Sequence, residues 1–200
     1  MGGAMDLRFA YLQARKGNDD DDPKFASYVA GARANTSIAL GPYLFVYCLP
    51  EDPAHPGRSP EDQAQAFFVA SAGLGCNAGE LPPAIDIESP SPDRWDVDGV
   101  SRGFLDDMTG RCADKVESLF GRSPIIYTYP WWQKEAQLVK VASRRLWIAS
   151  YQDVPAIPAP WTSCVMQQTA GGARLRLPNG SPCDSDVVAD EATFAALLAA

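Results

Sequence analysis

Two acidic residues, Asp86 and Glu88, interrupt the apolar segment 81–89 (LPPAIDIES) at a spacing that suits acid–base chemistry. Residues two apart in a strand point to the same face, so the two carboxyls share one face while Ile85 and Ile87 point to the other. At a rise of about 3.3 Å per residue, their backbone positions lie roughly 6.6 Å apart. Two carboxyls at this separation can flank one glycosidic bond, one giving a proton and the other stabilising positive charge on the sugar. The alternative for acids at a strand end is solvation, or an ion pair with an arginine or lysine.

The elements around this segment alternate between strands and helices. Pro83 can open a strand, because an initial strand position need not donate to the ladder, and Pro90 and Pro92 prevent the strand from continuing. Apolar runs predict strands over 7–14, 38–47, 83–88, 123–129, 145–151, 163–169 and 183–188. Helical spacing and capping residues predict helices over 23–34, 60–74, 97–120, 131–141 and 191–198.

This order predicts an α/β fold built as an irregular, TIM-like β/α barrel. Five parallel β/α units come first, and short antiparallel strands follow them. No glycine-rich phosphate loop follows any strand, which disfavours a nucleotide-binding fold. In a barrel the functional residues lie at the carboxyl ends of the strands. The polar and aromatic residues at these ends are Glu88, Tyr127, Tyr129, Tyr151, Gln167 and Gln168.

Composition narrows the classes of partner. The 200 residues are enough for one domain with a proper core, and hydrophobic residues make up 46% of them. Seventeen basic against 25 acidic residues give a net charge of −8, which argues against a nucleic-acid or anionic-membrane partner. No apolar run is long enough for a transmembrane helix, and no signal peptide is recognised at the start. We expect one domain over 5–200, with residues 1–4 as a cloning or leader remnant.

The cysteines and the single histidine offer little for metal or nucleophilic chemistry. Five cysteines without a CxxC pair, and His55 as the only histidine, disfavour a zinc site, so no metal or cofactor is expected. One or two disulfides and fully reduced thiols both fit the cysteine number. A Ser/His/Asp triad would have to use His55, but no nucleophile-elbow motif is present. The acidic run 18–22 lacks the interleaved ligands of an EF-hand.

Seven short motifs, spread over nearly the whole chain, occur in an order that resembles the family 25 glycoside hydrolases. These are the Chalaropsis-type lysozymes of bacteria, fungi and phage lysins. The motifs are Gln13–Gly17 (QARKG), Gly41–Phe45 (GPYLF), Pro83–Glu88 (PAIDIE), Pro124–Thr128 (PIIYT), Leu146–Tyr151 (LWIASY), Met166–Thr169 (MQQT) and Cys183–Asp186 (CDSD). The irregular barrel that this resemblance implies agrees with the order of elements above.

The resemblance also implies the chemistry, which is hydrolysis of the β-1,4 bond between N-acetylmuramic acid and N-acetylglucosamine in peptidoglycan. Glu88 matches the general acid of the family, and Asp86 matches the carboxylate that stabilises an oxazolinium ion formed by the substrate's own N-acetyl group. Asp184 matches the acid near the last strand. These three residues are the predicted catalytic set.

The predicted substrate-binding residues are Tyr43, Tyr127, Trp147, Tyr151 and Gln167. Flat apolar rings stack on sugar faces while their polar edges bind hydroxyl groups, so the aromatic members would line a sugar groove. Ordinary core packing is the alternative for these aromatics, and for Trp147 in mid-strand both interpretations stand.

The sequence departs from the family pattern at its start. The family begins with an additional strand that carries an active-site aspartate, whereas Asp6 here lies just before the strand that would be the second. We therefore expect the first strand to be missing and one edge of the barrel to be open. The family's Tyr-His-Phe is replaced by Tyr43-Leu44-Phe45, and Met166 stands where a Trp is frequent.

These features predict an endolysin-type muramidase whose partner is the peptidoglycan glycan strand. It would act at the bacterial cell wall, released by lysis, through a holin, or as part of a virion or larger protein. A separate wall-binding domain or protein is a further expected partner. Two alternatives remain: a catalytically impaired wall-binding or virion structural module on the same fold, and a metal-dependent carbohydrate enzyme that uses Asp184 and Asp186.

Overall fold

A computed structural model describes residues 7–18, 20–35, 37–50, 58–88, 100–176 and 182–199 of the chain. Residues 1–4, Asp6, His55 and the prolines at 90 and 92 lie outside this part, and so do the expectations attached to them. Within the described residues, no helix combines the length and apolar character that crossing a membrane requires.

The fold is mixed α/β, with one eight-stranded sheet whose strand order is β2-β1-β3-β4-β5-β6-β7-β8. The strands are β1 (Phe9–Lys16), β2 (Asp20–Asp21), β3 (Ala39–Phe45), β4 (Ala84–Asp86), β5 (Ile125–Thr128), β6 (Leu146–Ala149), β7 (Met166–Arg176) and β8 (Pro182–Val188). The helices are α1 (Phe25–Asn35), α2 (Pro60–Ala70), α3 (Arg102–Phe120), α4 (Pro130–Ala136) and α5 (Glu191–Leu198).

The sheet is curled into a half-barrel. Strands β1, β3, β4, β5, β6 and β7 pair in parallel, and β8 pairs antiparallel with β7. The rings of Tyr11 on β1 and Trp147 on β6 lie 4.9 Å apart between centroids, although their strands are not neighbours in the sheet. This contact crosses the interior and shows the curl.

The α/β class, the change from parallel to antiparallel pairing and an incompletely closed barrel are confirmed, and the eight-stranded sheet forms a half-barrel. The parallel part extends one strand further than expected, through β7. Among the described residues, the edge of β1 away from β3 pairs only with the two-residue β2, at Arg15 and Lys16. No hydrogen-bonded ladder therefore joins β1 to β8 within the described part of the chain.

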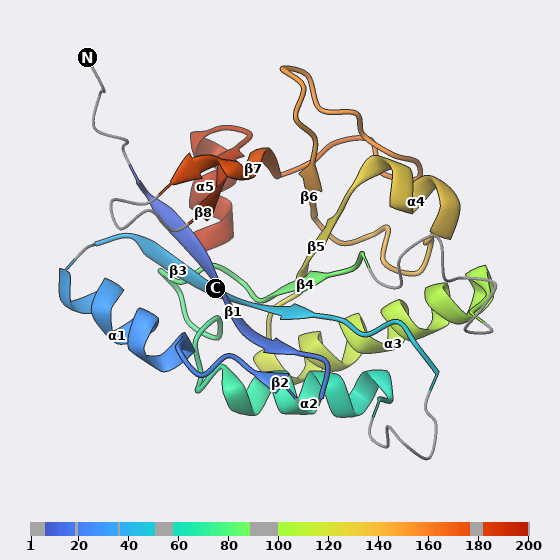
Figure 1. Cartoon of the computed structure of the whole chain (residues 1–200), viewed down its shortest axis with the longest axis horizontal. Coiled ribbons are helices and arrows are strands. Elements are labelled where there is room, and N and C mark those ends of the chain that lie inside the picture. Colours follow the sequence, from blue (N-terminus) through green and yellow to red (C-terminus); the bar gives the residue numbers. More distant parts are fainter. Residues whose placement is uncertain are drawn as a thin grey trace.

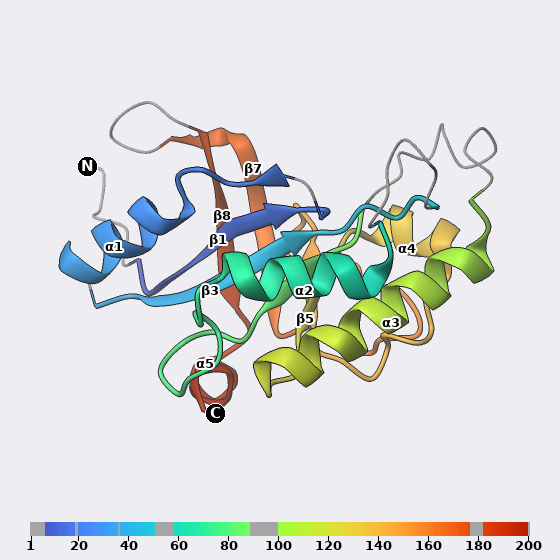
Figure 2. The same ribbon diagram turned by 90° about the horizontal axis from the view of Figure 1, so that it is seen from below.

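Two apolar cores lie on the two faces of the sheet. The larger core fills the space between the sheet and the helices, and Figure 1 shows α1, α2 and α3 along that side. Figure 2 shows α2 and α3 covering the sheet from below. The smaller core lies inside the curl, where Phe194 and Leu197 of α5 pack with Trp147 and Met166. The terminal helix thus closes one end of the half-barrel interior.

The helices begin and end at the residues that their local chemistry favours. The side chain of Ser59 accepts a hydrogen bond from the Asp62 amide at the start of α2, and Ser101 does the same for Phe104 at the start of α3. Gly121 ends α3 in the left-handed conformation, at φ 68°. Helix α4 is shorter than the predicted 131–141, and its last turn is followed by Gln137 at φ 55°.

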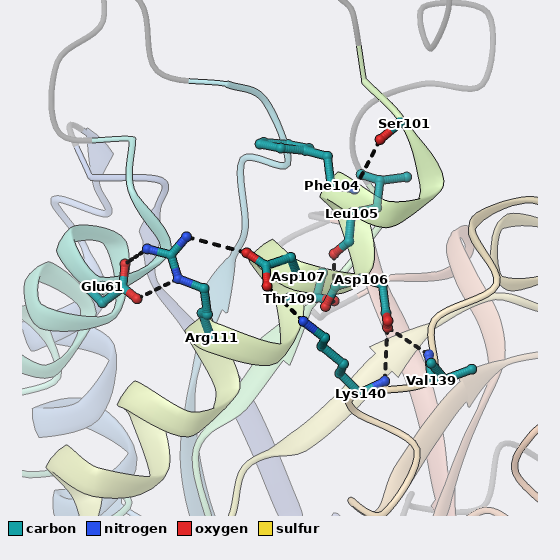
Figure 3. Close-up of polar contacts among 10 residues, drawn as sticks. All are labelled: Glu61, Ser101, Phe104, Leu105, Asp106, Asp107, Thr109, Arg111, Val139 and Lys140. Carbon is teal, nitrogen blue, oxygen red and sulfur yellow. Dashed lines mark hydrogen bonds and ion pairs between the residues drawn. The ribbon is translucent and has the colours of Figure 1, made fainter.

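The outer surface of α3 carries a network of paired charges (Figure 3). Arg111 donates two hydrogen bonds to Glu61 of α2, at 2.8 and 2.7 Å, and Lys140 donates to Asp107 at 2.7 Å. Asp106 accepts from the backbone amides of Val139 and Lys140 at 2.7 and 2.8 Å. Each acid of this network therefore has a donor, and the network ties α3 to its neighbours.

All five cysteines are free thiols, which decides between the two cysteine states left open by the sequence. Cys48 and Cys112 are fully buried in the outer core, where burial raises the pKa of both thiols. They behave there as small apolar side chains.

Candidate functional site

Strand β4 places Asp86 and Glu88 on the inner face of the half-barrel. Asp86 is in register with Tyr127 of β5, and the Ile87 amide donates to the Tyr127 carbonyl at 3.0 Å, so the extended chain continues past the end of β4. Ile85 and Ile87 are fully buried in the outer core. Because side chains alternate along a strand, this burial directs the two acids toward the interior and its rim.

Among the residues that the structure describes, neither acid of this pair has a compensating cation. Asp86 is 9% exposed, and its Oδ1 has no hydrogen-bond partner among the described residues. Glu88 is half-buried, and neither side chain forms an ion pair with a described residue. Burial and then the charge of Glu88 raise the pKa of Asp86 well above its usual range. Burial and then the charge of Asp184 raise the pKa of Glu88. Both carboxyls of the pair therefore keep a proton to higher pH than solvated acids do.

Strand β8 brings two further acids to the same end of the interior. Asp184 is exposed, and its charge acts on Glu88, Tyr43 and Tyr127. Asp186 is half-buried and accepts a hydrogen bond from the Trp147 indole at 2.8 Å. Burial raises the pKa of Asp186 to about 7, because the opposing effect of the Trp147 hydrogen bond is smaller. Four acids from two non-adjacent strands thus share one region.

A cavity of about 600 Å³ opens beside Glu88. Its walls include Tyr127, Tyr129, Trp131 and Tyr151. The hydroxyls of Tyr127 and Tyr151 both donate to Gln168 Oε1, each at 3.1 Å. A carboxyl group flanked by several aromatic rings and fixed hydroxyls is suited to binding a sugar next to a proton donor.

Tyr43 lies on the inner face with the acid pair. It pairs in register with Ala84, two residues before Asp86, and its hydroxyl donates to Gln13 Oε1 at 3.2 Å. Burial and then the charge of Asp86 raise its pKa. Tyr43 is therefore a neutral phenol that lies close enough to Asp86 to respond to its charge.

Three of the predicted binding residues, Tyr43, Trp147 and Gln167, are not among the cavity walls. Trp147 is only 7% exposed, because its ring packs against Tyr11 and Tyr127 and its indole N–H donates a hydrogen bond to Asp186. Gln167 is in register with the core residue Ile148, so it projects to the other face of the sheet from Trp147. Packing against Tyr11 and Tyr127 accounts for the position of the Trp147 ring, and its role in sugar binding stays a prediction.

Gln167 instead fixes a loop. Its Nε2 donates to the carbonyls of Ser150 and Gln152, at 2.6 and 2.7 Å, on either side of Tyr151. It therefore holds the segment that presents Tyr151, while its neighbour Gln168 accepts hydrogen bonds from Tyr127 and Tyr151.

The sequence reasoning left Gln168, Asp186, Tyr129 and Trp131 out of the predicted site. Tyr129 and Trp131 form a stacked pair, with ring centroids 6.2 Å apart and planes 10° from parallel, and Trp131 is 48% exposed. The available signal was their position directly after β5, at the carboxyl end where functional residues gather. Among the described residues, no group of three or more acids, cysteines or histidines is arranged to hold a metal ion.

A half-barrel with paired carboxyls at the strand ends is the architecture of a glycoside hydrolase. The chain matches the model of the glycosyl hydrolases family 25 over residues 3–172, and it belongs to that family.

Relatives of known sequence and structure agree with this placement. The chain is 30% identical over 131 residues to the N,O-diacetylmuramidase of Chalaropsis sp, covering 62% of this chain and 57% of that one. It is 34% identical over 134 residues to the N,O-diacetylmuramidase of Arthroderma benhamiae, covering 66% and 51%. The matches thus span between half and three fifths of these relatives. The solved muramidase from Acremonium alcalophilum superposes with a TM-score of 0.76 at 26% identity, covering 96% of this chain and 87% of that chain.

Proposed function

We propose that this chain is a muramidase, which hydrolyses the β-1,4 bond between N-acetylmuramic acid and N-acetylglucosamine in peptidoglycan. The observation that carries the proposal is the acid pair Asp86 and Glu88, which is unpaired by any described cation and adjoins an aromatic-lined cavity. The family and the names of its muramidase relatives support the choice of substrate.

In the proposed reaction Glu88 is the general acid. It gives its proton to the oxygen of the leaving sugar as the bond from that oxygen to C1 breaks. The carbonyl oxygen of the substrate's own N-acetyl group attacks C1 and forms an oxazolinium ion, whose positive charge the Asp86 carboxylate stabilises. Water then attacks C1 and returns a proton to Glu88, and the ring of the intermediate opens to restore the N-acetyl group.

Asp184 and the polar groups of the cavity have supporting roles in this proposal. The charge of Asp184 helps to keep the pKa of Glu88 raised, so that Glu88 is protonated when substrate binds. Tyr127 and Tyr151, both oriented by Gln168, present their rings and oxygens to the sugar. Tyr43 contacts the substrate near Asp86.

The decisive experiment compares clearing of cell-wall suspensions and release of reducing sugar ends by wild type, Glu88→Gln and Glu61→Gln. Glu88→Gln keeps the shape but cannot give a proton, so we expect a loss of about 10²- to 10⁴-fold. Glu61→Gln makes the same chemical change at an acid that accepts hydrogen bonds from Arg111, and the activity of this variant should equal that of wild type. Equal clearing by all three proteins would refute the assignment of Glu88.

The biological role we infer is cell-wall lysis, with this chain as the catalytic domain of an endolysin-type enzyme. If wild type sedimented with peptidoglycan and released no reducing ends, the protein would instead be a wall-binding module on this fold.

A further inference from the structure

A second cavity, of about 540 Å³, adjoins the one beside Glu88. It lies between α4 and the proline-rich segment 156–160, and the two cavities share Pro130 and Ala156 as walls. A ligand bound at Glu88 would therefore lie next to the second cavity.

The lining of the second cavity is mostly aliphatic. Ile157, Pro158, Pro160 and Val139 form much of its wall, and Val139 is 60% exposed. The amide of Gln133 is already used, because its Nε2 donates to the carbonyls of Leu138 and Ala159 at 2.9 and 3.1 Å. An exposed valine beside prolines offers an apolar surface with few free hydrogen-bonding groups.

Lys134 adds one positive charge to this wall. It is exposed, and it forms no ion pair with any residue that the structure describes. The neighbouring acid Glu135 is paired with Arg102 at 3.6 Å, so it does not neutralise the lysine. In a chain of net charge −8, an unpaired lysine at the rim of an apolar cavity is a local site for a carboxylate.

We infer that this second cavity binds the peptide that peptidoglycan carries on the lactyl group of N-acetylmuramic acid, an inference that rests on the proposed function. Alanine methyl groups of that peptide match the aliphatic wall, and a peptide carboxylate matches Lys134. A saccharide fits less well, since sugars bind through aromatic faces and many polar contacts, and these lie in the first cavity. The peptide begins on the sugar whose bond is cut, and at roughly 3.3–3.6 Å for each extended residue a three-residue peptide reaches roughly 10–11 Å.

The test compares peptide-bearing glycan strands with strands from which an amidase has removed the peptides. We expect wild type to show a higher kcat/KM on the peptide-bearing strands. Lys134→Gln should lower the ratio of the two kcat/KM values by about threefold, the size expected of an exposed ion pair. Val139→Ser should lower the same ratio, because it removes apolar wall. Lys24→Gln, an exposed lysine on another part of the chain, is the matched control and should keep the wild-type ratio.

Binding provides a second readout that does not depend on turnover. In a Glu88→Gln background, calorimetry should show tighter binding of a peptide-bearing disaccharide than of the peptide-free disaccharide, and Lys134→Gln should narrow that difference. A ratio and a binding difference that Lys134→Gln and Val139→Ser leave unchanged would overturn the peptide site. Absence of cleavage by wild type on both substrates would instead count against the proposed function, and the binding measurement would still decide the peptide site.

Discussion

The acids on the outside of α3 and the acids at the end of β4 are the same residue types in opposite settings. Asp107 accepts from Lys140 and Arg111, and these hydrogen bonds lower its pKa (Figure 3). Asp86 and Glu88 have no such donors among the described residues, and burial raises the pKa of both. The helical surface therefore stabilises ionised carboxylates, while ionisation of the acids at the strand end is energetically costly.

This difference separates acids that support the fold from acids that are available for chemistry. A solvated, paired carboxylate costs the folded state little, whereas a buried carboxylate without a partner is costly when it ionises. Perturbed carboxyl groups that gather in a cleft are typical of functional sites. The contrast gives a direct criterion: isosteric removal of charge should act in opposite directions on stability in the two regions.

The largest effect is expected for Asp86→Asn. Loss of the carboxylate should reduce muramidase activity by about 10²- to 10³-fold, the size typical of a lost electrostatic contact to a transition state. Because folding raises the pKa of Asp86, its ionised form destabilises the folded state above the usual carboxyl range. The variant should therefore gain stability relative to wild type as the pH rises, which urea unfolding at pH 5 and pH 8 would measure.

Asp107→Asn is the control for that experiment. The pKa of Asp107 is lowered in the fold, so its carboxylate contributes stability above the usual carboxyl range and its removal should lower stability at pH 8. Its activity should stay at the wild-type level. A loss of stability in both variants at pH 8 would show that Asp86 has a stabilising partner. That result would contradict the proposed difference between the acids of α3 and the acids at the end of β4.

The order of strands and helices was predictable because its signals are local. Prolines and glycines punctuate apolar runs, and Ser59 and Gly121 mark the ends of α2 and α3, where the structure also places them. The curl of the sheet was not predictable in this way. It depends on contacts between distant segments, such as Tyr11 with Trp147 and the packing of α5 inside the curl.

The acid pair was predictable for a similar reason, since two residues on one strand share a face whatever the rest of the chain does. The neighbouring glutamines show the limit. Gln167 and Gln168 point to opposite faces, and only the register of β7 with β6 decides which one faces the interior. The hydrogen bond from Trp147 to Asp186 depends on the register of β8 with β7, and this register shifts twice along the two strands. Local periodicity carries no information on that register.

An effect of intermediate size, on the pH dependence of stability, is expected for Asp186→Asn. The pKa of Asp186 is about 7 in the fold, against an ordinary value of 3.8. Between these values the folded chain holds a proton that the unfolded chain releases, so wild-type stability should fall as the pH rises through this window. At about 1.4 kcal/mol per pH unit, the fall over this window is on the order of 4 kcal/mol, and the variant should lack it.

The asparagine oxygen can still accept from the Trp147 indole, which keeps the surrounding packing comparable. The measurement is the free energy of unfolding in urea at intervals from pH 4 to pH 8. Asp153→Asn, at an exposed position, is the matched control and should follow the wild-type curve. Identical curves for wild type and Asp186→Asn would show that Asp186 is charged in the folded protein at pH 5.

The smallest change in stability is expected for Glu61→Gln, in the network of paired charges on α3. Glu61 and Arg111 form a bidentate pair whose side chains are 41% and 50% exposed, and exposed pairs contribute roughly 0.2–1 kcal/mol. Glu61 also lies in the first turn of α2, where a negative charge is favourable. The variant should therefore lose up to about 1 kcal/mol of unfolding free energy at low salt. Because both effects are screened, this loss should shrink at 1 M salt. A gain in stability from Glu61→Gln, in the direction expected for Asp86→Asn, would mean that pairing does not distinguish the two regions.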